Sequence, residues 1–161
     1  MGAISKVFFK ILPIAFFLKV IAVITIILTL FFYFGSFYEL TIAGVKWSGY
    51  KIVFEGKVAL ITWGFIFVLL ALASFIITLF YRIKHLLKAK KLPVLIGSIL
   101  GTVFSLFASI ICFSTQNIIS DNEVINLMTK QGWAATFCGA LLLISSLLGG
   151  LSILFNLSKK Q

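Results

Sequence analysis

The sequence predicts an all-α membrane protein: a four-transmembrane-helix bundle with a small extracellular β-hairpin in the first outer loop and a short helix in the second. Of its 161 residues, 61% are hydrophobic and only 11% are charged, whereas soluble domains carry about 25% charged residues. The mean hydropathy is +1.19. Four continuous apolar runs are each long enough to cross roughly 30 Å of hydrocarbon. Runs of this kind favour helices over a β-barrel, whose strands alternate in polarity over about ten residues.

The four runs make the chain a single tetraspan membrane domain, residues 1–161. Its segments are a first span at about 20–37, an outer loop 38–57, a second span 58–80, a basic inner loop 81–93, a third span 94–113, an outer loop 114–132, a fourth span 133–155 and a cytoplasmic tail 156–161. Pro93 suits the first turn of the third helix. The first run is too long for a signal-peptide core and no small-x-small site follows it, so we expect a retained helix.

The segment before the first span has two interpretations. Residues 5–19 carry Lys6, Lys10 and Lys19 among apolar side chains. They form either a short amphipathic helix on the inner membrane surface or the start of one long, tilted first helix whose lysines extend to the headgroups. Lys19 alone is placed to enter hydrocarbon, where a charge is a functional candidate. Its closeness to the inner interface favours snorkelling.

The charges predict the orientation. The N-terminal segment, the inner loop and the tail carry basic residues and no acid, so the whole net charge of +10 falls on one side. The positive-inside bias then predicts a multi-pass protein of the plasma (cytoplasmic) membrane with both termini cytoplasmic. The inner loop is expected to contact anionic lipid headgroups, at about 1 kcal/mol per basic side chain. These residues are Arg82, Lys84, Lys88, Lys90 and Lys91. Topology alone explains them, so no nucleic-acid partner is predicted.

Small residues recur along the third and fourth spans. Such residues let helix backbones approach closely, and packing drives helix association in lipid. The stripe serves either tight packing inside one bundle or a self-association surface, and the two uses are compatible. The predicted helix-packing or oligomer interface comprises Gly97, Gly101, Ser105, Ser109, Gly139, Ser146 and Gly150.

The first outer loop has two β-prone runs, 39–42 and 50–55, on either side of the turn-rich segment 44–49. This pattern predicts an antiparallel hairpin. Trp47 is expected to anchor at the headgroups or to contact a partner. The predicted partner-contact residues of this loop are Trp47, Tyr50 and Phe54.

The second outer loop contains Ser120 and, three residues on, Glu123. This capping-box pattern predicts a short helix that continues through Lys130. Cys112 and Cys138 fall near the outer ends of adjacent spans. They serve either as small apolar packing residues or as a disulfide, and the first is favoured because Cys138 lies more than a turn inside its span.

No constellation of residues indicates catalysis. All four carboxylates fall in the outer loops, and the one histidine, His85, belongs to a basic cytoplasmic segment. General acid–base chemistry needs groups that converge, and no P-loop, HExxH, GxSxG or Cys/His cluster is present. The sequence therefore predicts no enzyme, no catalytic or metal-binding residue and no cofactor.

The layout resembles the claudin-type tetraspan plan, with cytoplasmic termini, a β-rich first outer loop, a short basic inner turn and a shorter second outer loop. The resemblance covers nearly the whole chain and is one of architecture. The claudin first loop carries a Gly-Leu-Trp motif and two cysteines, whereas this loop has only Trp47 and no cysteine. Junction-forming function is therefore not carried over, and the chain looks more like a small bacterial tetraspan membrane protein.

Three functions follow as hypotheses. The leading one is an integral membrane structural or accessory protein that self-associates or binds another membrane protein. The alternative is an oligomeric pore or small-molecule transporter. It requires a water-filled path lined by Thr102, Ser105, Ser109, Ser145 and Ser146. The third, an enzyme acting on lipid, requires a buried acid or histidine.

Overall fold

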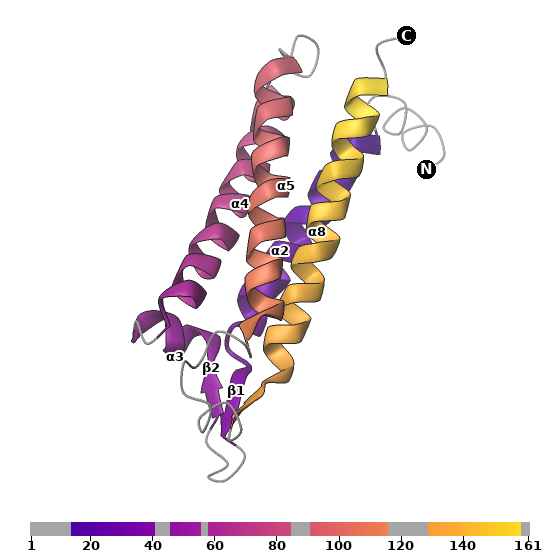
Figure 1. The fold of residues 1–161 in the computed structure, drawn as a ribbon. Helices are drawn as coiled ribbons and strands as arrows, with labels where there is room; N and C mark the ends of the chain where they lie inside the picture. Colours follow the sequence, from indigo (N-terminus) through magenta and orange to yellow (C-terminus); the bar gives the residue numbers. More distant parts are fainter. Residues whose placement is uncertain (1–13, 41–45, 56–57, 85–90, 116–128, 159–161) are drawn as a thin grey trace, which may run out of the picture.

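A computed structural model describes residues 14–40, 46–55, 58–84, 91–115 and 129–158, and four long helices dominate it (Figure 1). Each of the four is long and apolar enough to cross a membrane. They therefore fit a tetraspan layout and indicate a multi-pass membrane protein. The helices are α2 (Ile14–Phe32), α4 (Ala59–Lys84), α5 (Lys91–Phe113) and α8 (Trp133–Ser158).

The helices pack in a chain of neighbours: α4 against α5, α5 against α8, and α8 against α2, with a smaller contact between α2 and α4. A small sheet lies beyond one end of the bundle, called here the sheet end (Figure 1). The opposite end, where α2 and α5 begin and α4 and α8 finish, is called the distal end. The four helices run antiparallel to their sequence neighbours, so a short connection joins α4 to α5 at the distal end, whereas the two longer connections at the sheet end carry α3 and the strands.

The first helix lies nearer the N-terminus than the sequence indicated. It begins at Ile14 and ends at Phe32, whereas the predicted span was about 20–37. Residues 14–19 thus continue the first helix, and the rest of the segment 5–19 lies outside the described residues. A turn follows α2, with the Gly35 N–H donating to the Phe32 carbonyl. A Cβ on Gly35 would lie 2.6 Å from the Ala134 Cβ, so this close approach to α8 requires glycine.

The sheet end holds three short strands in the order β2-β1-β3, with both pairs antiparallel. They are β1 (Ser36–Leu40), β2 (Lys46–Ser48) and β3 (Thr129–Gln131). An antiparallel strand pair was predicted here and is present, but its strands lie at other residues: β2 falls within the segment 44–49 that was predicted to be the turn. The third strand comes from the second connecting segment, so the sheet joins the two segments that leave the bundle at this end.

Two predicted elements are wrong in part. The second β-prone run, 50–55, forms most of a short helix, α3 (Gly49–Phe54), capped by the Ser48 hydroxyl, which accepts from the Lys51 N–H. Burial of Ile52 and Val53 on one face of α3 outweighs their β propensity. The helix expected to run through Lys130 does not include residues 129–131, which pair with the edge of β1. Residues 116–128 lie outside the described part.

Polar side chains inside the bundle are mostly hydroxyls that bond to their own helix. Thr29 donates to the Thr25 carbonyl at 2.9 Å, and Ser105 donates to the Gly101 carbonyl at 2.8 Å. This back-bonding satisfies a hydroxyl without water. On the outside, large apolar side chains such as Ile77, 65% exposed, and Leu147, 62% exposed, cover the helices. An apolar surface of this extent is typical of a chain that faces lipid.

Candidate functional site

The small-residue stripe of α5 lies at contacts within the chain. Added Cβ atoms on Gly97 and Gly101 would overlap Thr78 and Phe75 of α4. On the other side of α5, the Ser109 hydroxyl donates to the Gly139 carbonyl of α8 at 2.8 Å. The stripe therefore brings α5 close to both of its neighbours.

The rest of the predicted interface lies on α8. A Cβ on Gly139 would approach the ring of Phe113 at 3.1 Å, and Ser146 is buried. Gly150 differs, because a Cβ there would meet nothing within 4 Å. Since most of the stripe is covered by the chain's own helices, self-association through it stays a prediction, and Gly150 is the position at which added volume meets open space.

An exposed aromatic group lies at the sheet end and comprises Phe34, Tyr50 and Phe54. The ring centroids of Phe34 and Tyr50 are 4.4 Å apart, and those of Tyr50 and Phe54 are 6.0 Å apart and stacked. Phe34 is 72% and Phe54 80% exposed. The sequence predicted Tyr50 and Phe54 as contact residues but missed Phe34, which it had placed inside the first span.

Tyr50 holds this aromatic group in place. Its backbone N–H donates to the Tyr33 carbonyl at 3.1 Å, and its hydroxyl donates to the Leu30 carbonyl at the same distance. Its ring also contacts Phe65 of α4, edge to face, with centroids 5.5 Å apart. Burial raises the pKa of the Tyr50 hydroxyl, which favours the protonated, donating form. Two helices thus fix the position of α3.

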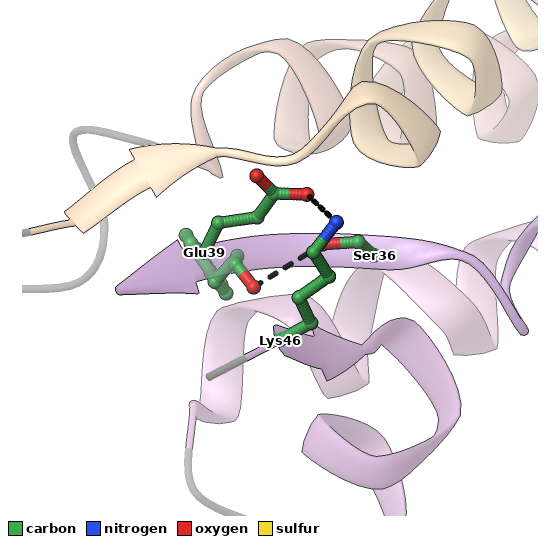
Figure 2. A network of polar contacts seen from close by, with 4 residues as sticks. Ser36, Glu39 and Lys46 are labelled. Carbon is green, nitrogen blue, oxygen red and sulfur yellow. Dashed lines mark hydrogen bonds and ion pairs between the residues drawn. The ribbon is translucent and has the colours of Figure 1, made fainter. Parts of the chain in front are cut away.

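Trp47, the third predicted contact residue, lies on β2 opposite Tyr38 and is half-buried against the core. Figure 2 shows the polar side of the same strand pair, where Glu39 of β1 and Lys46 of β2 point toward one another. Their charged groups are 3.3 Å apart, and the Lys46 side chain is 64% exposed. An ion pair this exposed contributes little stability. The structure therefore gives Trp47 a packing role in the sheet.

The sheet is tied to the helix ends by buried hydrogen bonds. The Tyr38 hydroxyl donates to the Thr115 carbonyl, and the Gln131 side-chain amide donates to the Cys112 carbonyl at 3.0 Å. The Gly132 N–H donates to the Phe37 carbonyl at 2.7 Å. Burial raises the pKa of Tyr38 well above its ordinary value. These contacts hold β1, β3 and the end of α5 together.

The two cysteines are buried free thiols, so the disulfide alternative is wrong in this structure. Cys112 Sγ lies 3.9 Å from the Tyr33 hydroxyl, and Cys138 Sγ donates to the Thr29 carbonyl at 3.6 Å. Both thiols act as small packing groups with weak polar contacts.

The distal end contains a cluster that the sequence did not predict. Lys19 was expected to snorkel, yet it is 0% exposed. It shares a buried face of α2 with Ala15, Ala22 and Ile26, and this spacing was the available signal. Arg82 of α4 donates through Nη1 to Oδ1 of Asn156 on α8 at 3.1 Å. Lys19 Nζ and Asn156 Nδ2 are buried without a hydrogen-bond partner.

The other predicted lipid-contact residues lie at helix ends or outside the described residues. Lys84 and Lys91 lie at the distal ends of α4 and α5, whereas Lys88 and Lys90 lie outside the described residues, as does His85. Within the described ranges, no group of three or more His, Cys, Asp or Glu side chains is placed to hold a metal ion.

Compared with protein-family models, with curated proteins and with solved structures, the chain gives no match. The four long apolar helices fit a tetraspan layout, and the claudin-like architecture stays a prediction.

Proposed function

We propose that the protein is an integral membrane structural or accessory subunit that self-associates or binds another membrane protein. It would lie in the plasma membrane with both termini on the cytoplasmic side. The four apolar helices support membrane insertion. Trp63 and Trp133 support a membrane–water interface at the sheet end, because both are half-exposed near the sheet-end starts of α4 and α8. Tryptophans at this level are typical of a membrane–water interface.

The exposed aromatic group of Phe34, Tyr50 and Phe54 carries the proposal. Aromatic side chains dominate binding energy where they are held rigidly and become buried on association. Here the hydrogen bonds and ring contacts of Tyr50 fix the group before any partner arrives. Little side-chain entropy is then lost on binding, which favours affinity.

Packing inside the bundle supports a partner contact outside the small-residue stripe. The glycines of α5 and Ser109 are occupied by contacts with α4 and α8, so a partner helix has no access to them in this fold. The aromatic group at the sheet end is accessible to a partner, because Phe34 and Phe54 are exposed. We therefore assign the partner contact to the sheet end rather than to the stripe.

No described contact favours the pore alternative. The hydroxyls of Thr102, Ser105, Ser109 and Ser145 each donate to a backbone carbonyl. Three of them, Ser105, Ser109 and Ser145, are at most 1% exposed. Bonds of this kind support a packing role for these four hydroxyls, and Ser146, the fifth residue of the predicted path, is buried.

Photo-crosslinking in intact membranes tests the assignment. A benzoylphenylalanine placed at position 54 should give adducts of one or two defined masses. The same probe at Phe80 is the control, because Phe80 is 72% exposed but lies toward the distal end of α4. Absence of adducts at position 54, or the same adducts at both positions, contradicts the proposal.

A further inference from the structure

The distal cluster of Lys19, Arg82 and Asn156 is a set of donors without an acceptor. Lys19 is fully buried, and its ammonium group has no hydrogen-bond partner. Its helix, α2, packs against both α4 and α8, which carry Arg82 and Asn156 near their distal ends. Arg82 also reaches from α4 to Asn156 on α8, across the distal end. Three helices therefore contribute one donor group each.

The orientation of the Asn156 amide follows from its partner. A guanidinium only donates, so the atom that accepts from Arg82 at 3.1 Å is the amide oxygen. The amide nitrogen is then the atom left buried without a partner. Its unpaired N–H groups add to those of Lys19, and each group would be satisfied by an oxygen acceptor.

The chain supplies no carboxylate for this cluster among the described residues. Glu39 and Glu55 lie at the sheet end, where they face Lys46 and Lys51. The other two carboxylates, Asp121 and Glu123, belong to the segment that connects α5 to β3. Two cations and an unpaired amide in a lipid-facing bundle are costly unless they are paired, and such groups usually mark a ligand or ion site.

The depth of the cluster fits a phosphate group. Lys19 lies roughly 8 Å along α2 from its start at Ile14, at 1.5 Å per residue. Arg82 and Asn156 lie within one turn of the ends of α4 and α8. If the four helices span a bilayer, side chains this close to the distal helix ends would lie near the headgroup phosphates. Arginine and lysine bind phosphate oxygens by charge-assisted hydrogen bonds.

We propose that Lys19, Arg82 and Asn156 bind a phosphate-type anion at the distal end, supplied either by an anionic lipid headgroup or as free phosphate. The anion's oxygens accept from the Lys19 ammonium, from the free N–H groups of Arg82 and from Asn156 Nδ2. The site would link α2, α4 and α8 and stabilise the bundle where Arg82 of α4 already bonds to Asn156 of α8. This inference does not depend on the proposed partner contact at the sheet end.

Thermal unfolding in an uncharged detergent tests the site with defined probes. The three tryptophans report unfolding. Delipidated protein is titrated with dioctanoyl phosphatidylglycerol, with dioctanoyl phosphatidylcholine and with inorganic phosphate, and Tm is recorded. We expect Tm to rise with phosphatidylglycerol or with inorganic phosphate, because a ligand that binds only the folded state stabilises it. A rise in Tm with phosphatidylglycerol but not with inorganic phosphate identifies a lipid headgroup as the ligand. A rise in Tm with inorganic phosphate identifies a free anion.

Three variants separate the site from general surface charge. Lys19→Met should weaken the apparent affinity about tenfold to a hundredfold, as expected for the loss of charge-assisted hydrogen bonds. Asn156→Leu keeps both charges and should also weaken binding. Lys84→Met removes one charge from the end of the same helix as Arg82 and should change the affinity less than about fivefold.

Lys19→Met is expected to fold, because replacing an unpartnered buried charge by an apolar side chain removes a cost. Its Tm without ligand should match or exceed that of the wild type. The proposal is overturned if neither phosphatidylglycerol nor inorganic phosphate raises the wild-type Tm more than phosphatidylcholine does. It is equally overturned if Lys19→Met and Lys84→Met lose the same affinity, since the response would then come from the basic surface as a whole.

Discussion

Buried hydroxyls in this bundle differ in where their hydrogen bonds go. Ser105 bonds within its own helix, to the Gly101 carbonyl, whereas Ser109 bonds across to the Gly139 carbonyl of α8. Both side chains are at most 1% exposed. A bond that crosses between helices contributes to their association, and a bond that folds back on its own helix does not. The two serines are therefore chemically matched but structurally different.

Ser109→Ala should lower the free energy of unfolding by about 0.6 kcal/mol, the average for hydrogen bonds between membrane helices. Ser105→Ala should change it by less, because the lost bond is local to α5. Reversible unfolding in mixed detergent micelles measures both. A larger loss for Ser105→Ala than for Ser109→Ala would contradict the assignment of the crossing bond.

For single residues, the sequence predicted the small positions that pack between helices but missed the burial of Lys19 and the contact of Asn156 with Arg82. The four-residue spacing of Gly97, Gly101, Ser105 and Ser109 was sufficient to predict a packed face. The burial of Lys19 was not predicted, because charge and nearness to the interface favour snorkelling, and only the rotation of α2 decides which side a lysine faces. Asn156 gave no signal, since its role depends on Arg82, a residue far from it in sequence.

Glycine positions on α5 and α8 differ in the space that surrounds them. A Cβ on Gly97 would overlap Thr78 of α4, and it would also lie 3.4 Å from the Ser74 carbonyl oxygen. A Cβ on Gly150 would meet nothing within 4 Å. Replacing glycine by alanine is therefore expected to lower stability at position 97 and to leave it unchanged or raise it at position 150.

Gly97→Ala should destabilise the protein by about 1–3 kcal/mol, since α4 and α5 must move apart to admit the methyl group. Gly150→Ala should leave stability unchanged or raise it by up to about 1 kcal/mol through helix propensity. Thermal unfolding of the purified variants distinguishes these outcomes. Equal destabilisation by both would show that α8 has a tightly packed partner at Gly150 that the monomer lacks.

The sheet end depends on the Tyr38 hydroxyl, which donates to the Thr115 carbonyl at the end of α5. Tyr38→Phe leaves that carbonyl without its donor and should cost about 1–3 kcal/mol. Loss of the Tyr38–Thr115 hydrogen bond should speed the hydrogen exchange of the Gly132 N–H, because that N–H bonds to the carbonyl of Phe37, the residue next to Tyr38. Unchanged exchange at Gly132 would mean that β1 and β3 are held without this bond.

Alkaline pH offers a second test of the same contact. Burial raises the pKa of Tyr38 and of Tyr33 above the ordinary 10.0. A tyrosine whose pKa is higher in the folded state binds its proton more tightly there than in the unfolded state. The stability that this difference contributes is complete below pH 10 and is lost as the pH rises above 10. The Tm of the wild type should therefore fall as the pH is raised above 10. Tyr38→Phe should reduce that fall without abolishing it, and an equal fall in both proteins would contradict the role of Tyr38.

Helices and strands could be predicted where the sequence of the segment alone determines its structure. Four apolar runs indicate four helices, because length and polarity are local properties. The run 50–55 was mistaken for a strand, since its β-prone residues form a helix once Ser48 caps it and Ile52 and Val53 face the core. Strand β3 was missed, because its pairing with β1 joins residues far apart in sequence, and no local pattern reports a distant partner.

The described part of the molecule combines an apolar exterior along the helices with a different group of side chains at each end. Side chains such as Ile77 and Leu147 cover the middle of the helices, a surface suited to lipid. The sheet end presents the rigid aromatic group of Phe34, Tyr50 and Phe54, and the distal end gathers the donors Lys19, Arg82 and Asn156. Such a division suits a subunit that is anchored by lipid at one end and contacts a protein at the other.

The central claim is that this chain works as part of an assembly in the membrane. The most direct measurement is the mass and protein composition of the complex extracted from native membranes into nanodiscs. We predict either a homo-oligomer of the 17.8 kDa chain or a second protein in fixed ratio. A single 17.8 kDa chain with only lipid around it, recovered under several mild extraction conditions, would contradict the claim.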